Sequence, residues 1–280
     1  MVVQKSTCKK FWRWVNYFSI VFFSLNSLSI PSQLKTYKTL SFQQGYDDFQ
    51  IDHYGFIYQI NSDDLIKRNG KGEELYRYSN KFLGEITQLD VSNPLRPLLF
   101  YADQGVIAVL DNTLSQQKHI ISLNQIGLYQ AQCIANSNFD NGIWLFDIDV
   151  NEIIKINTHS EITYRSGNLS VILEKMTGPV LKLIEKNKKL YAITKNEIFI
   201  LDQFGALLKT TPVSASNGLI LNENNLLCYD GLFLKLYDIL NFKTDTLEKL
   251  DKFFKITGYS DQIMGLSKNR KELFFMRFLK

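Results

Sequence analysis

The sequence has little of what catalysis usually requires. Its 280 residues include only three cysteines and three histidines, and they contain no Gly-x-Ser-x-Gly elbow, no P-loop and no Gly-x-Gly-x-x-Gly phosphate loop. His53, His119 and His159 lie in different repeat units without a second histidine, cysteine or carboxylate at ligand spacing, whereas a zinc site needs several converging ligands. The sequence therefore predicts no catalytic residue, no metal site and no cofactor, and it favours a protein that is not an enzyme.

Proline and cysteine are also scarce. Five prolines and the lack of a low-complexity tract indicate an ordered chain. At 45% hydrophobic residues the chain can bury a large core, as one all-β unit or as two smaller domains. Cys133 and Cys228 lie inside apolar runs, which is typical of buried thiols. A disulfide between them is permitted in an exported protein, but no spacing indicates one.

The net positive charge of the sequence comes from its N-terminus. Lys5, Lys9, Lys10 and Arg13 precede an apolar stretch over 15–25, and Ser27 and Ser29 fit the −3 and −1 positions of a signal-peptidase site. We expect a signal peptide over residues 1–29 and one mature domain over 30–280. The alternatives are an uncleaved N-terminal anchor and a cytosolic start.

Removal of this segment changes the charge of the protein. The four basic residues account for the whole formal charge of +4, since residues 1–29 contain no acidic residue. A neutral mature chain lacks the basic surface that nucleic-acid binding requires. We therefore expect an exported protein, periplasmic or extracellular, that does not bind nucleic acid and meets a membrane only through a partner or through an uncleaved N-terminal segment.

A repeat of about 40 residues runs through the rest of the chain. Each unit has an apolar run, a short polar turn, a second apolar run and then Asn or Asp. The centres of the first runs are spaced by 42, 44, 47, 36 and 37 residues, and they are Tyr58, Phe100, Trp144, Tyr191, Leu227 and Met264. The residues that close the second run keep a similar spacing, and they are Asn69, Asp111, Asn157, Asp202 and Asp238. Two independent markers thus indicate the same repeat.

The runs are typical of short β-strands, because they are rich in Ile, Leu, Val, Phe and Tyr and are bounded by turn residues. The segment 244–254, the best candidate for an amphipathic helix, is better explained as a strand and its connector. The fold class is therefore all-β, a β-propeller of about six four-stranded blades. The sixth unit has room for only three strands, so we expect the strand over 35–43 to complete it and close the ring.

This pattern resembles the β-propeller superfamily of the WD40-like, quinoprotein-like and YncE-like kind, over roughly residues 35–280. The resemblance is architectural, because the chain has no Trp-Asp strand ending, no Gly-His pair, no kelch Gly-Gly, no YWTD block and no quinoprotein tryptophan motif. It therefore implies a fold, but no subfamily and no functional residues.

Carboxylates recur in the turns between the second and third strands, which lie on one face in propellers of this kind. They form a candidate rim for contact with a basic partner segment or a cation, and they are Asp63, Asp64, Asp103, Asp147, Asp149 and Asp230. The simpler interpretation is that aspartate suits turns. The string over 147–152 superficially suggests a calcium loop, but it lacks the sixth-position glycine, so we expect a hairpin turn.

Two functions follow from these features. The first is a non-enzymatic protein-interaction module, an accessory subunit of a cell-envelope or outer-membrane assembly for secretion or transport. The alternative is a small-ligand or metal-binding propeller enzyme, such as a lyase, a lactonase or a glycan-handling enzyme, with its site in the central channel. The predicted innermost strands contribute mainly small and apolar residues, which favours the first. Phe139, Phe204 and Tyr129, which lie outside the strands, indicate an exposed contact surface.

Overall fold

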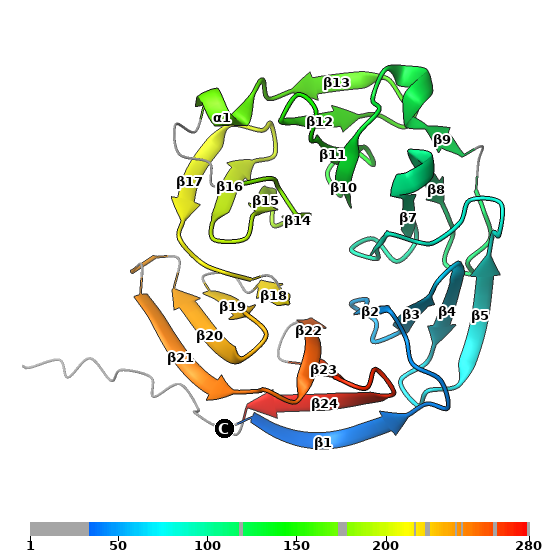
Figure 1. Cartoon of the computed structure of the whole chain (residues 1–280), viewed down its shortest axis with the longest axis vertical. Helices are drawn as coiled ribbons and strands as arrows, with labels where there is room; N and C mark the ends of the chain where they lie inside the picture. The colour runs from blue at the N-terminus through cyan, green and yellow to red at the C-terminus, as the bar shows by residue number, and fades with distance from the viewer. Residues whose placement is uncertain are drawn as a thin grey trace, which may run out of the picture. The chain divides into compact units, whose positions relative to one another are not determined.

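A computed structural model describes residues 34–117, 120–172, 178–215, 217–221, 225–238, 240–241, 243–259 and 262–278. The chain divides into two units, Met1–Ile30 and Pro31–Lys280, and all described residues belong to the second. The expected signal peptide therefore lies outside the described residues. The second unit is a ring of six sheets around a central axis (Figure 1).

Each of the six sheets has four antiparallel strands. The first blade consists of β2 (Asp48–Ile51), β3 (Ile57–Asn61), β4 (Asp64–Arg68) and β5 (Glu74–Ser79). The second consists of β6 (Gln88–Asp90), β7 (Leu98–Tyr101), β8 (Val106–Val109) and β9 (Ile121–Ser122). The third consists of β10 (Ala131–Asn136), β11 (Ile143–Asp147), β12 (Glu152–Ile156) and β13 (Ile162–Arg165).

The fourth blade consists of β14 (Lys182–Lys186), β15 (Lys189–Ile193), β16 (Ile198–Asp202) and β17 (Leu207–Thr211). The fifth consists of β18 (Gly218–Leu221), β19 (Asn225–Tyr229), β20 (Phe233–Asp238) and β21 (Lys243–Lys249). The sixth consists of β22 (Phe253–Tyr259), β23 (Gln262–Ser267), β24 (Glu272–Phe278) and β1 (Leu34–Ser41). Two 3-10 turns, η1 (Ala102–Gln104) and η2 (Leu123–Ile126), and a short helix, α1 (Leu169–Ile172), lie in the connections.

The predicted architecture is confirmed. The six expected repeat centres all lie on the second strand of a blade, and the segment 244–254 contains strands rather than a helix. The ring closes as expected, since β1 pairs antiparallel with β24 from Leu34 opposite Phe278 to Ser41 opposite Glu272. This closure gives the last blade its outer strand from the other end of the chain, which covers the open edge of β24.

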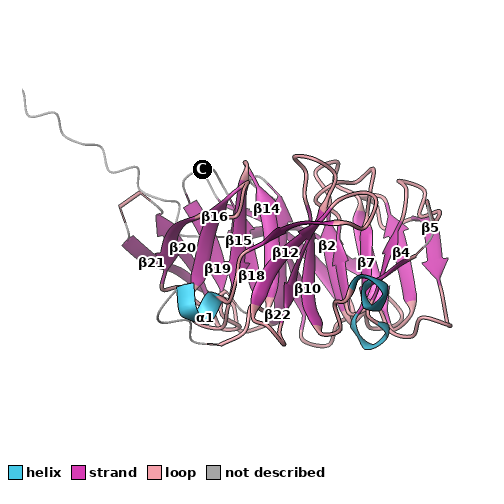
Figure 2. Cartoon of the chain, turned by 90° about the horizontal axis from the view of Figure 1, so that it is seen from above, coloured by secondary structure: helices cyan, strands magenta, loops and turns pink. Residues whose placement is uncertain are grey.

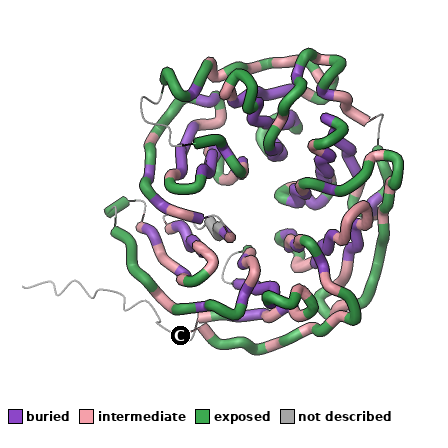
Figure 3. Tube along the Cα trace, viewed as in Figure 1, coloured by how far each residue is buried: buried purple, intermediate pink, exposed green. Residues whose placement is uncertain are grey.

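The hydrophobic core lies between the blades. Buried side chains form six clusters, one at each junction of neighbouring sheets. The second and third strands of most blades are buried on both faces, which explains their continuous apolar runs, and exposure concentrates on the outer strands (Figure 3). A single blade cannot cover its own two faces, so the ring is the unit that folds. Cys133 and Cys228 are buried free thiols within these clusters.

The recurring Asn or Asp has a local structural cause. At each position the side-chain Oδ1 accepts hydrogen bonds from backbone N–H groups two and three or four residues further along the chain, which builds the turn between the third and fourth strands. These residues are Asn69, Asp111, Asn157, Asp202 and Asp238. The sequence repeat therefore has two structural causes, the packing of the core and the side-chain hydrogen bonds that build these turns.

Candidate functional site

The ring has two faces that carry different connections. Because the strands of a blade alternate in direction, the turns between second and third strands share one face with the blade-to-blade connections. We call it the β3–β4 face, and the opposite one, which carries the turns between first and second strands, the β2–β3 face. Figure 2 shows the strands running between the two faces, with α1 near the edge of the β3–β4 face.

All six carboxylates of the candidate rim belong to the β3–β4 face, but they differ in accessibility. Asp147 is buried, and Asp63, Asp64 and Asp230 are half-buried. Only Asp103 and Asp149 are exposed. The rim is thus a set of separate turns and not a cluster: within the described part of the chain, no three His, Cys, Asp or Glu side chains are placed to hold a metal ion.

Most rim carboxylates have local partners. Asp64 pairs with Arg77 at 3.0 Å and Asp230 with Lys235 at 2.7 Å. Asp63 accepts a hydrogen bond from the Ser79 hydroxyl at 2.6 Å, and Asp147 accepts one from the backbone N–H of Asp149 at 3.0 Å. Burial acts to raise the pKa of Asp230, but the hydrogen bond from Lys235, the backbone hydrogen bonds from Phe233 and Leu232 and the Lys235 charge together keep that pKa below its usual value. Local structural contacts therefore account for these four carboxylates: Asp147 and Asp230 bond to the backbone of their own turns, and Asp63 and Asp64 bond to side chains of β5.

The exposed Asp149 lies in an apolar surround. Ile148 and Val150 flank it in the hairpin turn between β11 and β12, with 41% and 42% of their surfaces exposed. The string over 147–152 is thus a hairpin turn, as expected, and Asn151 adopts a positive φ of 54° in it. Tyr129 and Val171, with 66% and 76% exposed, lie on the same face.

Hydrogen bonds join these segments into one surface. The Ile148 backbone N–H donates to the Gln130 carbonyl at 3.0 Å, and the Asn168 side chain donates to the Val150 carbonyl at 3.0 Å. The turn therefore lies between the segments that carry Tyr129 and Val171. We call Tyr129, Ile148, Asp149, Val150, Val171 and Ile172 the turn patch. Exposed apolar side chains gathered on one face, with Asp149 as the one charged residue among these six, mark an interaction site more often than scattered apolar residues do.

The exposed aromatic residues expected from the sequence are confirmed, but they lie on both faces. Tyr129 belongs to the β3–β4 face. Phe139 and Phe204, with 55% and 67% exposed, lie in turns of the β2–β3 face. Phe82, which is 97% exposed, lies in the connection from β5 to β6 and was not singled out by its sequence context.

The central channel contains a cavity of ≈ 490 Å³. It is lined by β2, β6, β14 and β22, by residues that follow these strands, and by Asn138 and Phe139 in the turn after β10, so it opens toward the β2–β3 face. The sequence led us to expect mainly small and apolar residues on the innermost strands. The lining is instead mixed, with Gln50, Gln88, Asp90, Lys182 and Glu185 among its residues.

Several of these polar side chains connect neighbouring blades. Gln50 donates to the Leu89 carbonyl at 2.6 Å, and Gln88 exchanges two hydrogen bonds with the backbone of Ile134, at 2.8 and 2.9 Å. These contacts satisfy backbone groups on the inner edges of the sheets, where the ladder of each blade ends. They therefore stabilise the ring.

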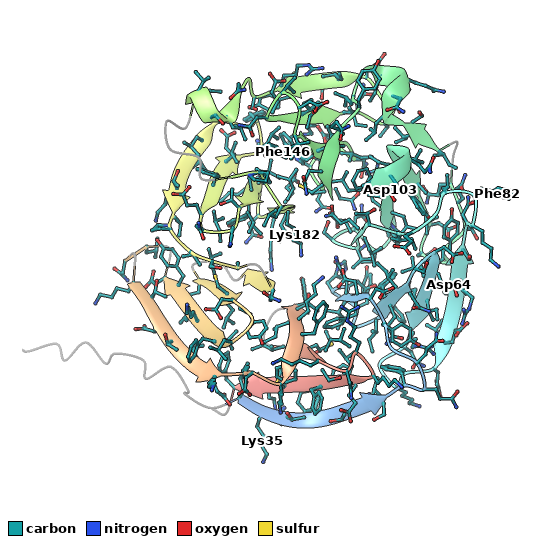
Figure 4. All side chains as sticks on the ribbon, viewed as in Figure 1. Lys35, Asp64, Phe82, Asp103, Phe146 and Lys182 are labelled. Carbon is teal, nitrogen blue, oxygen red and sulfur yellow. The ribbon has the colours of Figure 1, made fainter. Side chains whose placement is uncertain are left out.

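Lys182 has no such role. Its side chain points toward the centre of the ring (Figure 4), and it forms no hydrogen bond or ion pair within the part of the chain that the structure describes. Burial, and then the charge of Lys255, lower the pKa of the Lys182 ammonium to about 8, although Asp48 and Asp90 act in the opposite direction. Asp48 is itself paired with Lys255.

The histidines do not form a shared site. His53 lies in the β2–β3 turn with its ring 4.0 Å from Tyr54 and 5.9 Å from Tyr259. His159 lies in the turn between β12 and β13, where its backbone N–H donates to Asn157 at 2.9 Å. His119 lies outside the described residues.

No helix in the described portion is long and apolar enough to span a membrane.

Comparison with known proteins identifies the fold alone. No protein-family model and no curated protein matches the chain. Among solved structures, the chain is similar to a protein of the mitotic checkpoint complex, with 9% identity, a TM-score of 0.60 and coverage of 100% of this chain and 99% of that one.

Two further similar structures come from bacteria. A catalytically inactive virginiamycin B lyase from Staphylococcus aureus, solved with quinupristin, has 13% identity and a TM-score of 0.57 over 87% of this chain and 88% of that one. BamB from Moraxella catarrhalis has 14% identity and a TM-score of 0.50 over 84% and 70%. The protein has the fold of a six-bladed β-propeller. Such identities assign no subfamily and no activity.

Proposed function

We propose that the protein is a non-enzymatic docking module, an exported propeller that acts as an accessory subunit of a cell-envelope or outer-membrane assembly. The observation that carries this proposal is the turn patch, an exposed apolar surface on a hairpin turn, in which the Asp149 carboxylate has no ion pair among the described residues. The likeness to a chain of the mitotic checkpoint complex supports the general role, because that propeller belongs to a protein assembly. Export is supported by the basic and apolar residues over 1–29.

The chemistry of the patch defines the partner. Val150, Ile148 and Tyr129 offer apolar contact area, and Asp149 offers a single negative charge. Protein interfaces commonly combine an apolar centre with a few directed polar contacts. The occupant that fits is a protein segment with apolar side chains and one basic residue placed to meet Asp149.

The test is a pull-down of the tagged protein from its native envelope in mild detergent, with mass spectrometry and a matched pair of variants. Val150→Asp puts a second negative charge into the patch, and Phe204→Asp makes a similar change on the opposite face. We expect a stoichiometric partner that is lost with Val150→Asp and retained with Phe204→Asp.

Two outcomes would refute the proposal. One is recovery of a lone monomer from the wild-type protein. The other is a partner that both variants retain, since the patch would then not be its binding surface. Mass measurement of the recovered protein also tests export, because cleavage after Ser29 would shorten the chain by the first 29 residues.

A further inference from the structure

In the cavity of the central channel, the carboxylates are bonded to the wall while the ammonium of Lys182 is not. The docking function does not require this arrangement. Its wall contains three carboxylates, Asp52, Asp90 and Glu185, and all three are buried. Each of them accepts hydrogen bonds from donors of the wall. The donors are the backbone N–H groups of Tyr54, Phe56, Ser92, Asn136, Asn138 and Phe139, the Tyr58 hydroxyl and the Trp144 indole N–H. These carboxylates therefore face the wall rather than the cavity.

The cations of the cavity are arranged differently. Lys182 is the first residue of β14 and points into the channel, without a hydrogen bond or ion pair in the described portion of the protein (Figure 4). Its charged neighbours come from three other inner strands, Asp48 on β2, Asp90 on β6 and Lys255 on β22, and the thiol of Cys133 on β10 also lies near it. Asp48 is paired with Lys255 and Asp90 with backbone donors, so neither neutralises Lys182 directly.

The mouth of the cavity is aromatic. Tyr259 is 45% exposed, and the Lys186 ammonium lies 5.2 Å from the centre of its ring. The His53 ring lies on the same side of the mouth, 5.9 Å from Tyr259, and the exposed Phe139 also lines the cavity. Ring faces of this kind bind the flat apolar part of a ligand. A volume of ≈ 490 Å³ is within the range of small-molecule sites.

We propose that the central cavity binds a small organic oxyanion, whose carboxylate or phosphate pairs with Lys182 and whose apolar or aromatic body lies against Tyr259 at the mouth. This site is independent of the docking proposal, because the turn patch lies on the other face of the ring. The Lys182 ammonium attracts an anion and can donate charge-assisted hydrogen bonds to it, whereas the carboxylates of the wall repel an anion.

Titration calorimetry with two anions and one neutral isostere tests the proposal. The probes are benzoate, phenyl phosphate and benzamide, which share a ring and differ in charge. We expect saturable one-to-one binding of at least one anion and none of benzamide. Which of the two anions binds more tightly then distinguishes a carboxylate ligand from a phosphate ligand.

Variants assign the binding to Lys182. We expect Lys182→Met to weaken anion binding at least tenfold, Lys182→Arg to retain it, and Lys35→Met, on the outermost strand, to leave it unchanged. Since Lys182 loses its proton near pH 8, the affinity should fall about tenfold between pH 7 and pH 9. Circular dichroism spectra of the variants confirm that they are folded.

Three results would overturn this proposal. They are no saturable binding of either anion, equal binding of benzamide, and anion binding that survives Lys182→Met in a folded protein. The two proposals fail separately, because Val150→Asp should leave anion binding intact and Lys182→Met should leave partner capture intact.

Discussion

Replacement of Lys182 by methionine should stabilise the protein at neutral pH. The pKa of Lys182 falls from 10.5 in a solvated chain to about 8 in the fold, so the folded state holds this proton less tightly than the unfolded state does. Below pH 8 both states are protonated and the full cost of the charge is present. Each pKa unit corresponds to about 1.4 kcal/mol, which sets a ceiling of about 3 kcal/mol. Because the Lys182 residue is only half-buried, solvent screening lowers the expected gain to about 1–2 kcal/mol.

The pH dependence gives the sharper test. Between pH 8 and pH 10.5 the unfolded wild-type chain keeps the Lys182 proton while the folded chain loses it, so wild-type stability rises with pH relative to the variant. The gain of Lys182→Met should therefore be largest at pH 7 and vanish near pH 10.5. Urea unfolding, followed by fluorescence of the buried Trp144, measures both free energies. A variant less stable than wild type at pH 7, or a gain independent of pH, would refute the reasoning. Lys35→Met is the control.

Three further changes test the packing of the ring, each by denaturant or thermal unfolding. Glu185→Ala should cost about 3–5 kcal/mol, because it leaves the Trp144 indole N–H and two backbone N–H groups without their acceptor; a loss below about 1 kcal/mol would mean that water replaces the carboxylate. Gly218→Ala should cost about 1–3 kcal/mol, since its Cβ would lie 2.2 Å from the Ile256 carbonyl oxygen. Gly70→Ala, with open space around it, should cost less than about 1 kcal/mol, and equal losses would contradict the close approach at Gly218. Deletion of residues 1–41 removes β1 and exposes the edge of β24, so we expect oligomers by size exclusion; a stable monomer would show that closure by β1 is dispensable.

The fold could be predicted from the sequence because its determinants are local. Strands buried on both faces read as continuous apolar runs, and the turn after each third strand is built by an Asn or Asp within four residues. Strand closure could also be inferred, since the last unit lacked a strand and the segment over 35–43 had no other partner. The apolar runs and the recurring Asn or Asp can be recognised without knowing which blades are neighbours.

The cavity could not be predicted in the same way. Its lining comes from β2, β6, β14 and β22, which lie far apart in the sequence. One local signal existed: in "KLIEK", alternation places Lys182 and Lys186 on one side of the strand and buried Leu183 and Glu185 on the other. The sequence analysis placed this segment among the innermost strands but took its contribution to the channel as mainly small and apolar, and it did not single out Lys182.

The location of Lys182 is the strongest reason to assign the ring more than a docking role. Packing does not require a lysine at this position, because methionine would fill the same space without the cost of an ammonium that forms no hydrogen bond or ion pair among the described residues. Residues whose pKa is strongly shifted, and whose charge costs stability, are usually part of a binding or catalytic site. The proposed docking through the turn patch accounts for the exposed apolar residues of the β3–β4 face but gives no role to the charge of Lys182. Binding of an anion in the channel would give it a role, since the negative charge of the anion would offset the desolvation of the ammonium and raise the pKa of Lys182 again.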